Sequence, residues 1–185
     1  MALTKTPVCD FGKKAEDFKL KSINNKFVSL EEIKGKNGTL IMFICNHCPY
    51  VKAITKELVE DCSELKKIGI NTVAICSNDF VNYPDDSFDN MIKFSNERNF
   101  NFPYLHDETQ EIAKAYDAVC TPDFFGYNKN LELQYRGRLR ELKNLIPIKD
   151  GESDLLKAMK QIAETSEGPK DQIPSAGCSI KWKIN

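Results

Sequence analysis

Residues 39–77 constrain the fold more than any other part of the chain. Residues 39–44 and 70–77 are mostly apolar, as in strands that are buried on both faces of a parallel sheet. Between them, over residues 49–67, apolar side chains recur every three or four positions, as on one face of a helix. These positions are Val51, Ile54, Leu58, Cys62 and Leu65. Strand, helix and strand in this order predict a βαβ unit and therefore an α/β fold.

Patterns outside this unit predict further elements. Residues 17–20 and 26–28 alternate like two short strands and predict an N-terminal hairpin, and residues 123–127 and 131–136 predict a second hairpin. Residues 88–95, introduced by Asp85 and Asp86, predict a helix, and residues 155–163 predict another. A short helix should follow Asp107, with Asp107 and Gln110 as its cap.

Length and charge limit the class of protein. At 185 residues the chain predicts a single domain, residues 1–185, with a core at about 15–165 and a tail at 166–185 that packs on the surface. Its 26 basic and 27 acidic residues give a net charge of −1, so we expect no nucleic-acid partner. The apolar runs are shorter than the about 20 residues of a membrane span, and no secretory signal is visible. We therefore expect a cytoplasmic protein without membrane contact.

Seven cysteines are the unusual feature of the composition. An odd number cannot pair completely, and in a reducing compartment clustered cysteines indicate metal binding or redox chemistry. Cys62 and Cys76 fall within apolar patterns and should pack in the core, since a free cysteine behaves as a small hydrophobic residue. Cys9 lies near the N-terminus, where we expect no role for it.

Cys45 and Cys48 form a Cys-x-x-Cys pair where the first strand of the βαβ unit ends and its helix begins. Unpaired amides and the helix dipole stabilise a thiolate at such a position and lower the pKa of the thiol. We expect Cys45 to be the nucleophile, Cys48 to be the resolving thiol, and His47 to favour the Cys45 thiolate. Structural zinc and an inert buried pair are the alternatives. Zinc needs four ligands, and Cys9, His106 and Cys178 are distant in sequence, so we expect no metal and no cofactor.

Five segments in order resemble a known family: residues 43–51, 102–105, 120–125, 135–138 and 177–183. Together they are similar to peroxiredoxin-like (AhpC/TSA-like) proteins of the thioredoxin superfamily. The resemblance implies a thioredoxin-like fold, with a central mixed sheet flanked by helices, an N-terminal hairpin and a C-terminal extension. It also implies that Pro122 is cis and that Thr121 presents backbone groups to an incoming peptide or thiol.

The chain departs from the peroxiredoxin motif Pro-x-x-x-Thr-x-x-Cys. Counting back from Cys48 places Cys45 at the Thr position and Ile41 at the Pro position. Counting back from Cys45 places Met42 and Gly38 there, so neither register matches. This departure favours disulfide exchange over peroxide reduction.

The sequence therefore predicts a thiol-disulfide oxidoreductase, with protein or low-molecular-weight thiols and disulfides as substrates and a thiol reductant or reductase as electron donor. The alternatives are a peroxiredoxin-like thiol peroxidase that reduces hydroperoxides, and a non-enzymatic zinc or interaction module. Cys120 precedes the expected cis-proline by two residues, and is either a third redox thiol or a packed bystander. Cys178 in the tail has the same two interpretations.

Overall fold

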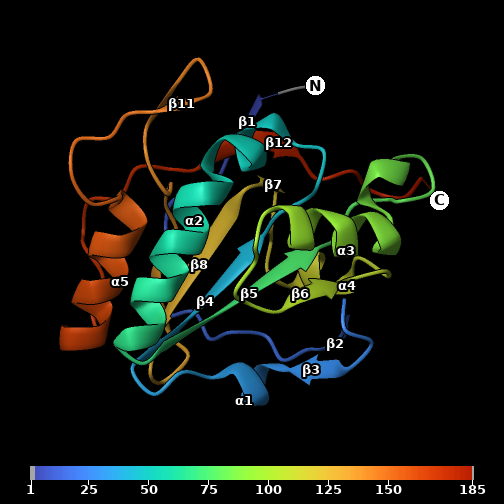
Figure 1. The fold of residues 1–185 in the computed structure, drawn as a ribbon. Helices are drawn as coiled ribbons and strands as arrows, with labels where there is room; N and C mark the ends of the chain where they lie inside the picture. Colours follow the sequence, from blue (N-terminus) through green and yellow to red (C-terminus); the bar gives the residue numbers. More distant parts are fainter. Residues whose placement is uncertain (1–2, 185) are drawn as a thin grey trace.

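The computed structural model describes residues 3–184 of the chain (Figure 1). In chain order the elements are β1 (Leu3–Lys5), β2 (Lys19–Ser22), β3 (Phe27–Ser29), α1 (Leu30–Ile33), β4 (Gly38–Phe43), α2 (Pro49–Lys67), β5 (Ile70–Cys76), the 3-10 helix η1 (Pro84–Asp86), α3 (Phe88–Glu97), β6 (Tyr104–His106), α4 (Glu111–Ala115), β7 (Cys120–Thr121), β8 (Asp123–Asn128), β9 (Leu133–Tyr135), β10 (Leu142–Lys143), β11 (Ile146–Pro147), α5 (Asp154–Thr165) and β12 (Ala176–Ser179).

Within residues 3–184, seven strands form the central sheet in the order β3-β2-β6-β5-β4-β8-β9. The pairs β4–β5 and β5–β6 are parallel, and the remaining neighbours are antiparallel. This arrangement confirms the βαβ unit, the mixed sheet and both predicted hairpins. Among the same residues, no helix combines the length and apolar character that crossing a membrane requires.

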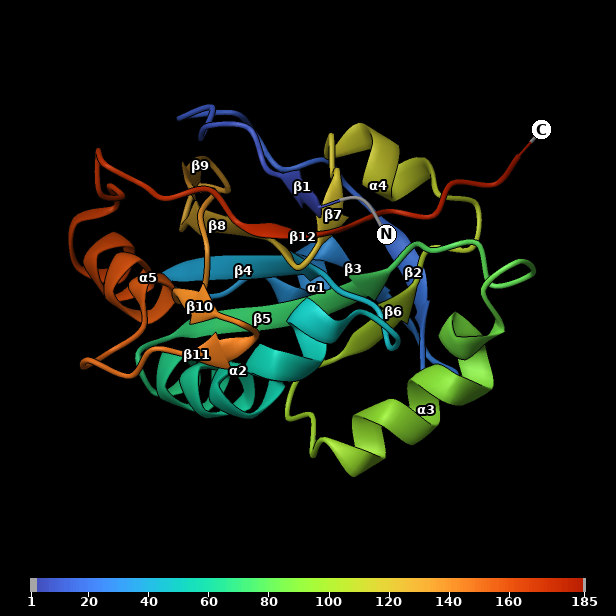
Figure 2. The same cartoon turned by 90° about the horizontal axis from the view of Figure 1, so that it is seen from above.

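Helices cover both faces of the central sheet because its strands are apolar on both sides. Alternate β4 residues contribute to two separate cores: Leu40 and Met42 pack with α2, α3 and α5, whereas Ile41 and Phe43 pack with α1 and α4. Figure 2 shows α2 and α3 on one side of the sheet and α4 on the other. Burial of this apolar surface is the main driving force for the layered arrangement.

The helix ends agree with the sequence in one case and differ in another. Helix α2 has the predicted bounds, with Pro49 in its first turn and Gly69, at φ +78°, just beyond its end. In α4 the N-cap is Gln110 at φ +66°, without a capping side chain. Asp107 caps the first turn by accepting hydrogen bonds from the amides of Ile112 (3.4 Å) and Ala113 (2.9 Å), so both expected residues lie at the cap, although not as a reciprocal pair.

The C-terminal tail differs most from the prediction. Much of it packs on the surface, but residues 176–179 form β12, which lies between β1 and β7 in a three-stranded sheet (Figure 2). Cys178 and Ile180 are 3% and 4% exposed, so this part of the tail is buried, whereas Ile173, Trp182 and Ile184 are exposed. Its short apolar stretch gives no strand pattern of its own, and only its strand partners reveal the role. The single-domain organisation stays a prediction.

A buried ion pair fixes the start of β8. Arg136 donates to Asp123 through Nη2 (3.0 Å) and Nε (3.3 Å) and to the Asp117 carbonyl oxygen (2.7 Å). The side chains of Arg136 and Asp123 are 7% and 0% exposed. Removal of one partner would leave an uncompensated charge in a medium that solvates it poorly.

We expect Asp123→Asn to lower the free energy of unfolding by about 3 kcal/mol, because Arg136 would keep its charge without its carboxylate. Urea denaturation measures this loss. The matched control is Asp117→Asn, which breaks the exposed pair with Lys13 and should cost less than about 1 kcal/mol. Equal losses in the two variants would contradict the role of burial.

Candidate active site

The Cys-x-x-Cys pair lies where β4 ends and α2 begins, as the sequence predicts. Cys45 follows the strand, and Cys48 is the N-cap residue of the helix. The Thr121–Pro122 peptide bond is cis, as the resemblance implies. Cys45 is 1% exposed and Cys48 is 0% exposed, so the structure covers both thiols.

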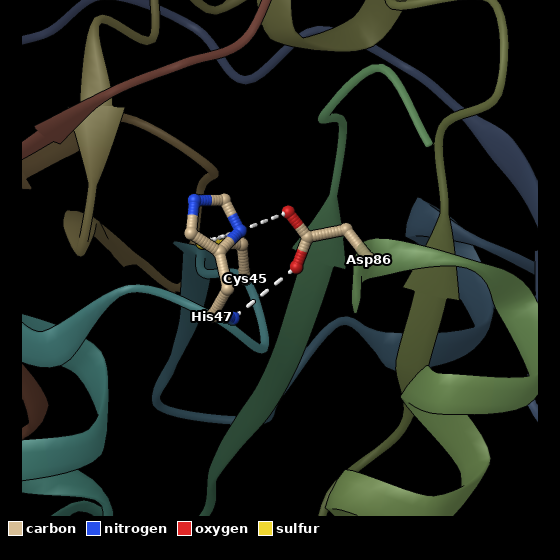
Figure 3. A group of neighbouring side chains, drawn as sticks. All are labelled: Cys45, His47 and Asp86. Atoms are coloured by element: carbon tan, nitrogen blue, oxygen red, sulfur yellow. Dashed lines mark hydrogen bonds and ion pairs between the residues drawn. The ribbon is translucent and has the colours of Figure 1, made fainter. Parts of the chain in front are cut away.

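The Cys45 thiol lies near polar groups of its own loop and of the segment that precedes the cis-proline. Its Sγ atom is 3.3 Å from Thr121 Oγ1 and 3.9 Å from His47 Nδ1. Figure 3 shows the His47 ring beside Cys45. Burial raises the pKa of Cys45 well above its ordinary value, and a hydrogen bond with Cys48 and the negative charge of Asp86 raise it further. These surroundings favour the neutral thiol.

The surroundings of Cys48 favour the thiolate instead. A hydrogen bond with Cys45 is the largest of the influences that lower the pKa of Cys48 from 9.0 to about 5, against the effect of burial. A hydrogen bond with Cys178 and the backbone amides of Val51 and Cys178 also favour the thiolate. The Thr121 carbonyl oxygen, 3.2 Å from Cys48 Sγ, is the neighbour that favours the neutral thiol, because it can accept only from an S–H group.

The location of the charge differs from the sequence expectation. We expected the helix N-terminus and His47 to stabilise a Cys45 thiolate, but the first turn of α2 follows Cys48, and Val51 is part of it. His47 hydrogen-bonds to Asp86, whose negative charge disfavours a Cys45 thiolate. In the reduced pair, the surroundings therefore favour the thiolate at Cys48 and the proton at Cys45.

Asp86 is a central residue of the site that the sequence did not reveal. Its fully buried carboxylate accepts hydrogen bonds from the Asn46 amide (2.8 Å), the His47 amide (3.3 Å) and Asn78 Nδ2 (2.7 Å), as well as from the His47 ring (2.6 Å) (Figure 3). The sequence correctly places Asp85 and Asp86 before the helix that begins at Phe88, but it gives Asp86 no role in the site. No local sequence pattern distinguishes an acidic residue that only precedes a helix from one whose side chain points into a functional site.

The His47 ring and the Asp86 carboxylate form an ion pair when the ring is protonated. The hydrogen bond with Asp86 raises the pKa of His47. Burial alone would raise the pKa of Asp86, but the hydrogen bonds from His47 and Asn78 outweigh it and leave that pKa below its ordinary value. The His47 ring also stacks on Tyr83, with 5.9 Å between the ring centroids.

Cys178 is a further residue near the pair. Its Sγ atom lies 3.1 Å from Cys48 Sγ, because β12 places Cys178 opposite Thr121 in the strand register. Cys120 is also buried, but its thiol donates to the carbonyl oxygen of Pro122 (3.6 Å), whereas the sulfur atoms of Cys45 and Cys48 contact Thr121. The backbone edge at Thr121, expected to receive a peptide, pairs with β12 instead.

The cysteines that we assigned to the core are buried there. Cys62 and Cys76 are 3% and 0% exposed, and burial raises the pKa of both thiols. The structure describes all seven cysteines, and none of them is in a disulfide.

One group of side chains near the pair has metal-ligand character. Potential ligand atoms of Cys45, His47 and Asp86 lie within 4.8 Å of one another. Zinc accepts sulfur, nitrogen and oxygen ligands of these types and usually takes four. The Asp86 oxygens already accept the hydrogen bonds described above, so a metal ion here would have to displace some of them.

We expect the Cys48 thiolate to titrate at about pH 5, with the thiol below that pH and the thiolate above it. In Cys45→Ala the midpoint should rise, because the largest stabilising hydrogen bond is lost. The ultraviolet absorbance of the thiolate, with Cys48→Ala as the blank, measures this without a reagent that must reach a buried thiol. If the midpoint of the Cys48 titration were unchanged in Cys45→Ala, the hydrogen bond between the two sulfurs could not be what lowers the pKa of Cys48.

We expect Asp86→Asn to lower the pKa of His47, because the carboxylate that stabilises the imidazolium is removed. The pKa of Cys45 should fall as well, since a negative charge beside it is lost. NMR titration of the His47 ring measures the first shift. Asp85→Asn, at an exposed position next in the chain, is the control and should leave the pKa of His47 in place.

Comparison with known proteins agrees with this architecture. The chain is similar over 100% of its length to an uncharacterized conserved protein from Geobacillus kaustophilus, with 42% identity, a TM-score of 0.95 and 98% of that chain covered. A hypothetical protein from Sinorhizobium meliloti 1021 is 32% identical, with a TM-score of 0.90, 98% of this chain covered and 100% of the other.

A more distant likeness identifies the fold. The thioredoxin domain of a thiol-disulfide oxidoreductase from Bacteroides vulgatus is 16% identical, with a TM-score of 0.58, and the match covers 68% of this chain and 86% of that one. No curated protein matches the sequence. The AhpC/TSA family matches residues 11–141, which is more than half of the chain, and supports a thioredoxin-like redox function. The chain thus belongs to the AhpC/TSA family and has a thioredoxin-like fold.

Proposed function

We propose that the protein catalyses thiol–disulfide exchange through Cys45 and Cys48, with Cys45 as the attacking thiol. The observation that carries the proposal is the position of both sulfurs at the start of α2 against Thr121 of the cis bond, 3.3 Å from its Oγ1 for Cys45 and 3.2 Å from its carbonyl oxygen for Cys48. The surroundings favour the thiolate at Cys48 and the thiol at Cys45. Such a pair has a proton acceptor beside the attacking group. Cys45 also contacts the half-buried His47, whereas β12 covers Cys48 through Cys178.

In the first step Cys45 Sγ attacks one sulfur of a substrate disulfide and passes its proton to Cys48. The substrate S–S bond breaks, and its second sulfur leaves with the electron pair as a thiolate. Cys48 returns its proton to that thiolate and attacks Cys45 Sγ, which releases the second substrate sulfur as a thiolate that takes up a proton from water. The substrate disulfide is reduced to two thiols, and the dithiol is oxidised to one disulfide. A thiol reductant or reductase restores the protein, and no metal or organic cofactor takes part.

His47, Asp86, Thr121 and Pro122 support this chemistry in the proposal. Asp86 fixes the loop between Cys45 and Cys48 through the amides of Asn46 and His47. Thr121 contacts both sulfurs, through Oγ1 and the carbonyl oxygen. Cys120 has a structural role in the proposal, since its thiol bonds to Pro122. We place the reaction in the cytoplasm, on protein or low-molecular-weight disulfides.

The second candidate is a thiol peroxidase, which the match to the AhpC/TSA family favours. Here Cys45 attacks a hydroperoxide, becomes a sulfenic acid and releases an alcohol or water. Cys48 then condenses with the sulfenic acid, which forms the disulfide and releases water. A zinc or interaction module is the third candidate, and stoichiometric zinc in freshly purified protein would replace both redox proposals.

The test compares the reaction of the reduced protein with glutathione disulfide and with hydrogen peroxide. For disulfide exchange, we expect Cys45→Ala to stop the reaction with glutathione disulfide. Cys48→Ala should accumulate a mixed disulfide at Cys45, because the resolving thiol is missing. Mass spectrometry of the intact protein detects the added glutathione.

The rate with hydrogen peroxide decides between the enzymes. A rate close to that of a free thiolate leaves disulfide exchange in place. A rate several orders of magnitude higher, lost in Cys45→Ala, would establish the peroxidase instead. A mixed disulfide that accumulates at Cys48 in Cys45→Ala would reverse the assigned roles of the two cysteines.

A further inference from the structure

Cys48 lies between two other thiols. On one side it shares a hydrogen bond with Cys45, and on the other its Sγ atom is 3.1 Å from Cys178 Sγ. A disulfide needs about 2.05 Å between its sulfurs, so a movement of about 1 Å would bring Cys48 and Cys178 to bonding distance. Cys178 is 3% exposed and is therefore shielded from reagents in solution.

The position of Cys178 is determined by strand pairing rather than by a loose end of the chain. Strand β12 pairs with β1 on one side and with β7 on the other, with Cys178 opposite both Leu3 and Thr121. At the preceding position, a Cβ atom on Gly177 would lie 2.0 Å from the Thr121 carbonyl oxygen, so no larger residue fits without a shift of the backbone. The two strands can therefore approach closely enough to hold the thiol against Cys48.

Side-chain hydrogen bonds fix β12 at both ends. Before the strand, Ser175 Oγ donates to the carbonyl oxygen of Pro122 (2.7 Å). After it, the Lys181 amide donates to Asn78 Oδ1 (2.9 Å), and Asn78 Nδ2 donates to Asp86. The strand that carries Cys178 is therefore bonded to the loop of the cis-proline and, through Asn78, to the carboxylate that orders the Cys-x-x-Cys loop.

We propose that Cys178 is a third redox thiol of this site, which attacks the Cys45–Cys48 disulfide at Cys48 and converts it into a Cys48–Cys178 disulfide. The proposal rests on the proposed function, because that function generates the first disulfide. It adds a second disulfide, between Cys48 and Cys178, that keeps the protein oxidised after Cys45 has reacted.

The step is an internal disulfide exchange that balances without another reactant. Cys178 loses its proton, and its Sγ atom forms a bond to Cys48 Sγ. The Cys45–Cys48 bond breaks, and Cys45 Sγ leaves with the electron pair and takes up a proton. The protein contains one disulfide before and after the step, so neither an oxidant nor a reductant is consumed.

The electrostatics make Cys178 responsive to the oxidation state of Cys48. In the reduced site, burial raises the pKa of Cys178 to about 12, and the hydrogen bond and negative charge of Cys48 contribute to the increase. In a Cys45–Cys48 disulfide Cys48 has no charge, so both of these contributions disappear. Lys181, which lowers the pKa of Cys178, remains. Cys178 therefore becomes easier to deprotonate when there is a disulfide to attack.

The outcome is an oxidised protein in which Cys45 is a thiol again. Cys45 can then form a mixed disulfide with a second substrate molecule, and this mixed disulfide persists because Cys48 is bonded to Cys178 of β12 and cannot resolve it. In a two-thiol site, oxidation would instead leave Cys45 blocked until a reductant arrives.

Disulfide mapping tests the proposal directly. The reduced wild-type protein is oxidised with one equivalent of glutathione disulfide, remaining thiols are alkylated, and the protein is digested with trypsin without reduction. Cys45 and Cys48 lie in one tryptic peptide, residues 37–52, and Cys178 lies in another, residues 171–181. A Cys45–Cys48 disulfide therefore stays within one peptide, whereas a Cys48–Cys178 disulfide joins the two.

We expect the joined peptides, with the alkyl group on Cys45. In Cys178→Ala only the disulfide within residues 37–52 should form, and alkylation of Cys45 in the oxidised protein should fall at least tenfold relative to wild type. Cys62→Ala, which removes a buried thiol elsewhere on α2, is the matched control and should give the wild-type map.

The alternative outcomes separate this proposal from the proposed function. A wild-type map with only the Cys45–Cys48 disulfide would overturn the role of Cys178 and leave disulfide exchange intact. A map without either disulfide would overturn both. Because the wild-type map alone decides between these outcomes, a folding defect in Cys178→Ala would not remove the test.

Discussion

The site depends on a single buried carboxylate, that of Asp86. Three segments distant in sequence meet at it: the loop after β4 through Asn46 and His47, the loop after β5 through Asn78, and the C-terminal tail, which Asn78 binds at the amide of Lys181. A buried anion is tolerated only when donors surround it, and here the donors are the residues that shape the site. Asp86 therefore orders the Cys-x-x-Cys loop directly and, through Asn78, the residue that follows β12 at Lys181.

Burial also confines the negative charge of the three neighbouring thiols to one sulfur, that of Cys48. Desolvation alone would keep Cys45, Cys48 and Cys178 neutral. The thiolate is favoured at Cys48 because the other two thiols and nearby amides can donate to it, whereas Cys45 faces the negative charge of Asp86. The neutral thiols of Cys45 and Cys178 thus both lower the pKa of Cys48. Oxidation of one of these sulfurs would therefore change the pKa values of the others.

The sequence predicted what depends on local pattern and missed what depends on long-range contact. Strand, helix and strand over residues 39–77 follow from hydrophobic periodicity, and the position of Cys45 and Cys48 at their junction follows from that order. The cis bond before Pro122 came from resemblance to a family, not from any property of the residues alone. The sequence left Cys178 as either a redox thiol or a packed bystander and gave Asp86 no role, because the contacts that bring them to the pair span 130 and 39 residues of chain.

Strand β12 links access to the site with its reactivity. It occupies the backbone edge of β7 at Thr121, where the family resemblance led us to expect an incoming peptide, so a peptide can pair there only after β12 has left. Departure of β12 would also remove Cys178, whose side chain and amide both favour the Cys48 thiolate. A reagent that is small enough to reach Cys45 past His47 meets the pair with Cys48 fully stabilised, whereas a peptide that displaces β12 meets a less acidic Cys48. In the proposed disulfide exchange, the paired β12 would therefore exclude an extended peptide from the backbone edge of β7 at Thr121.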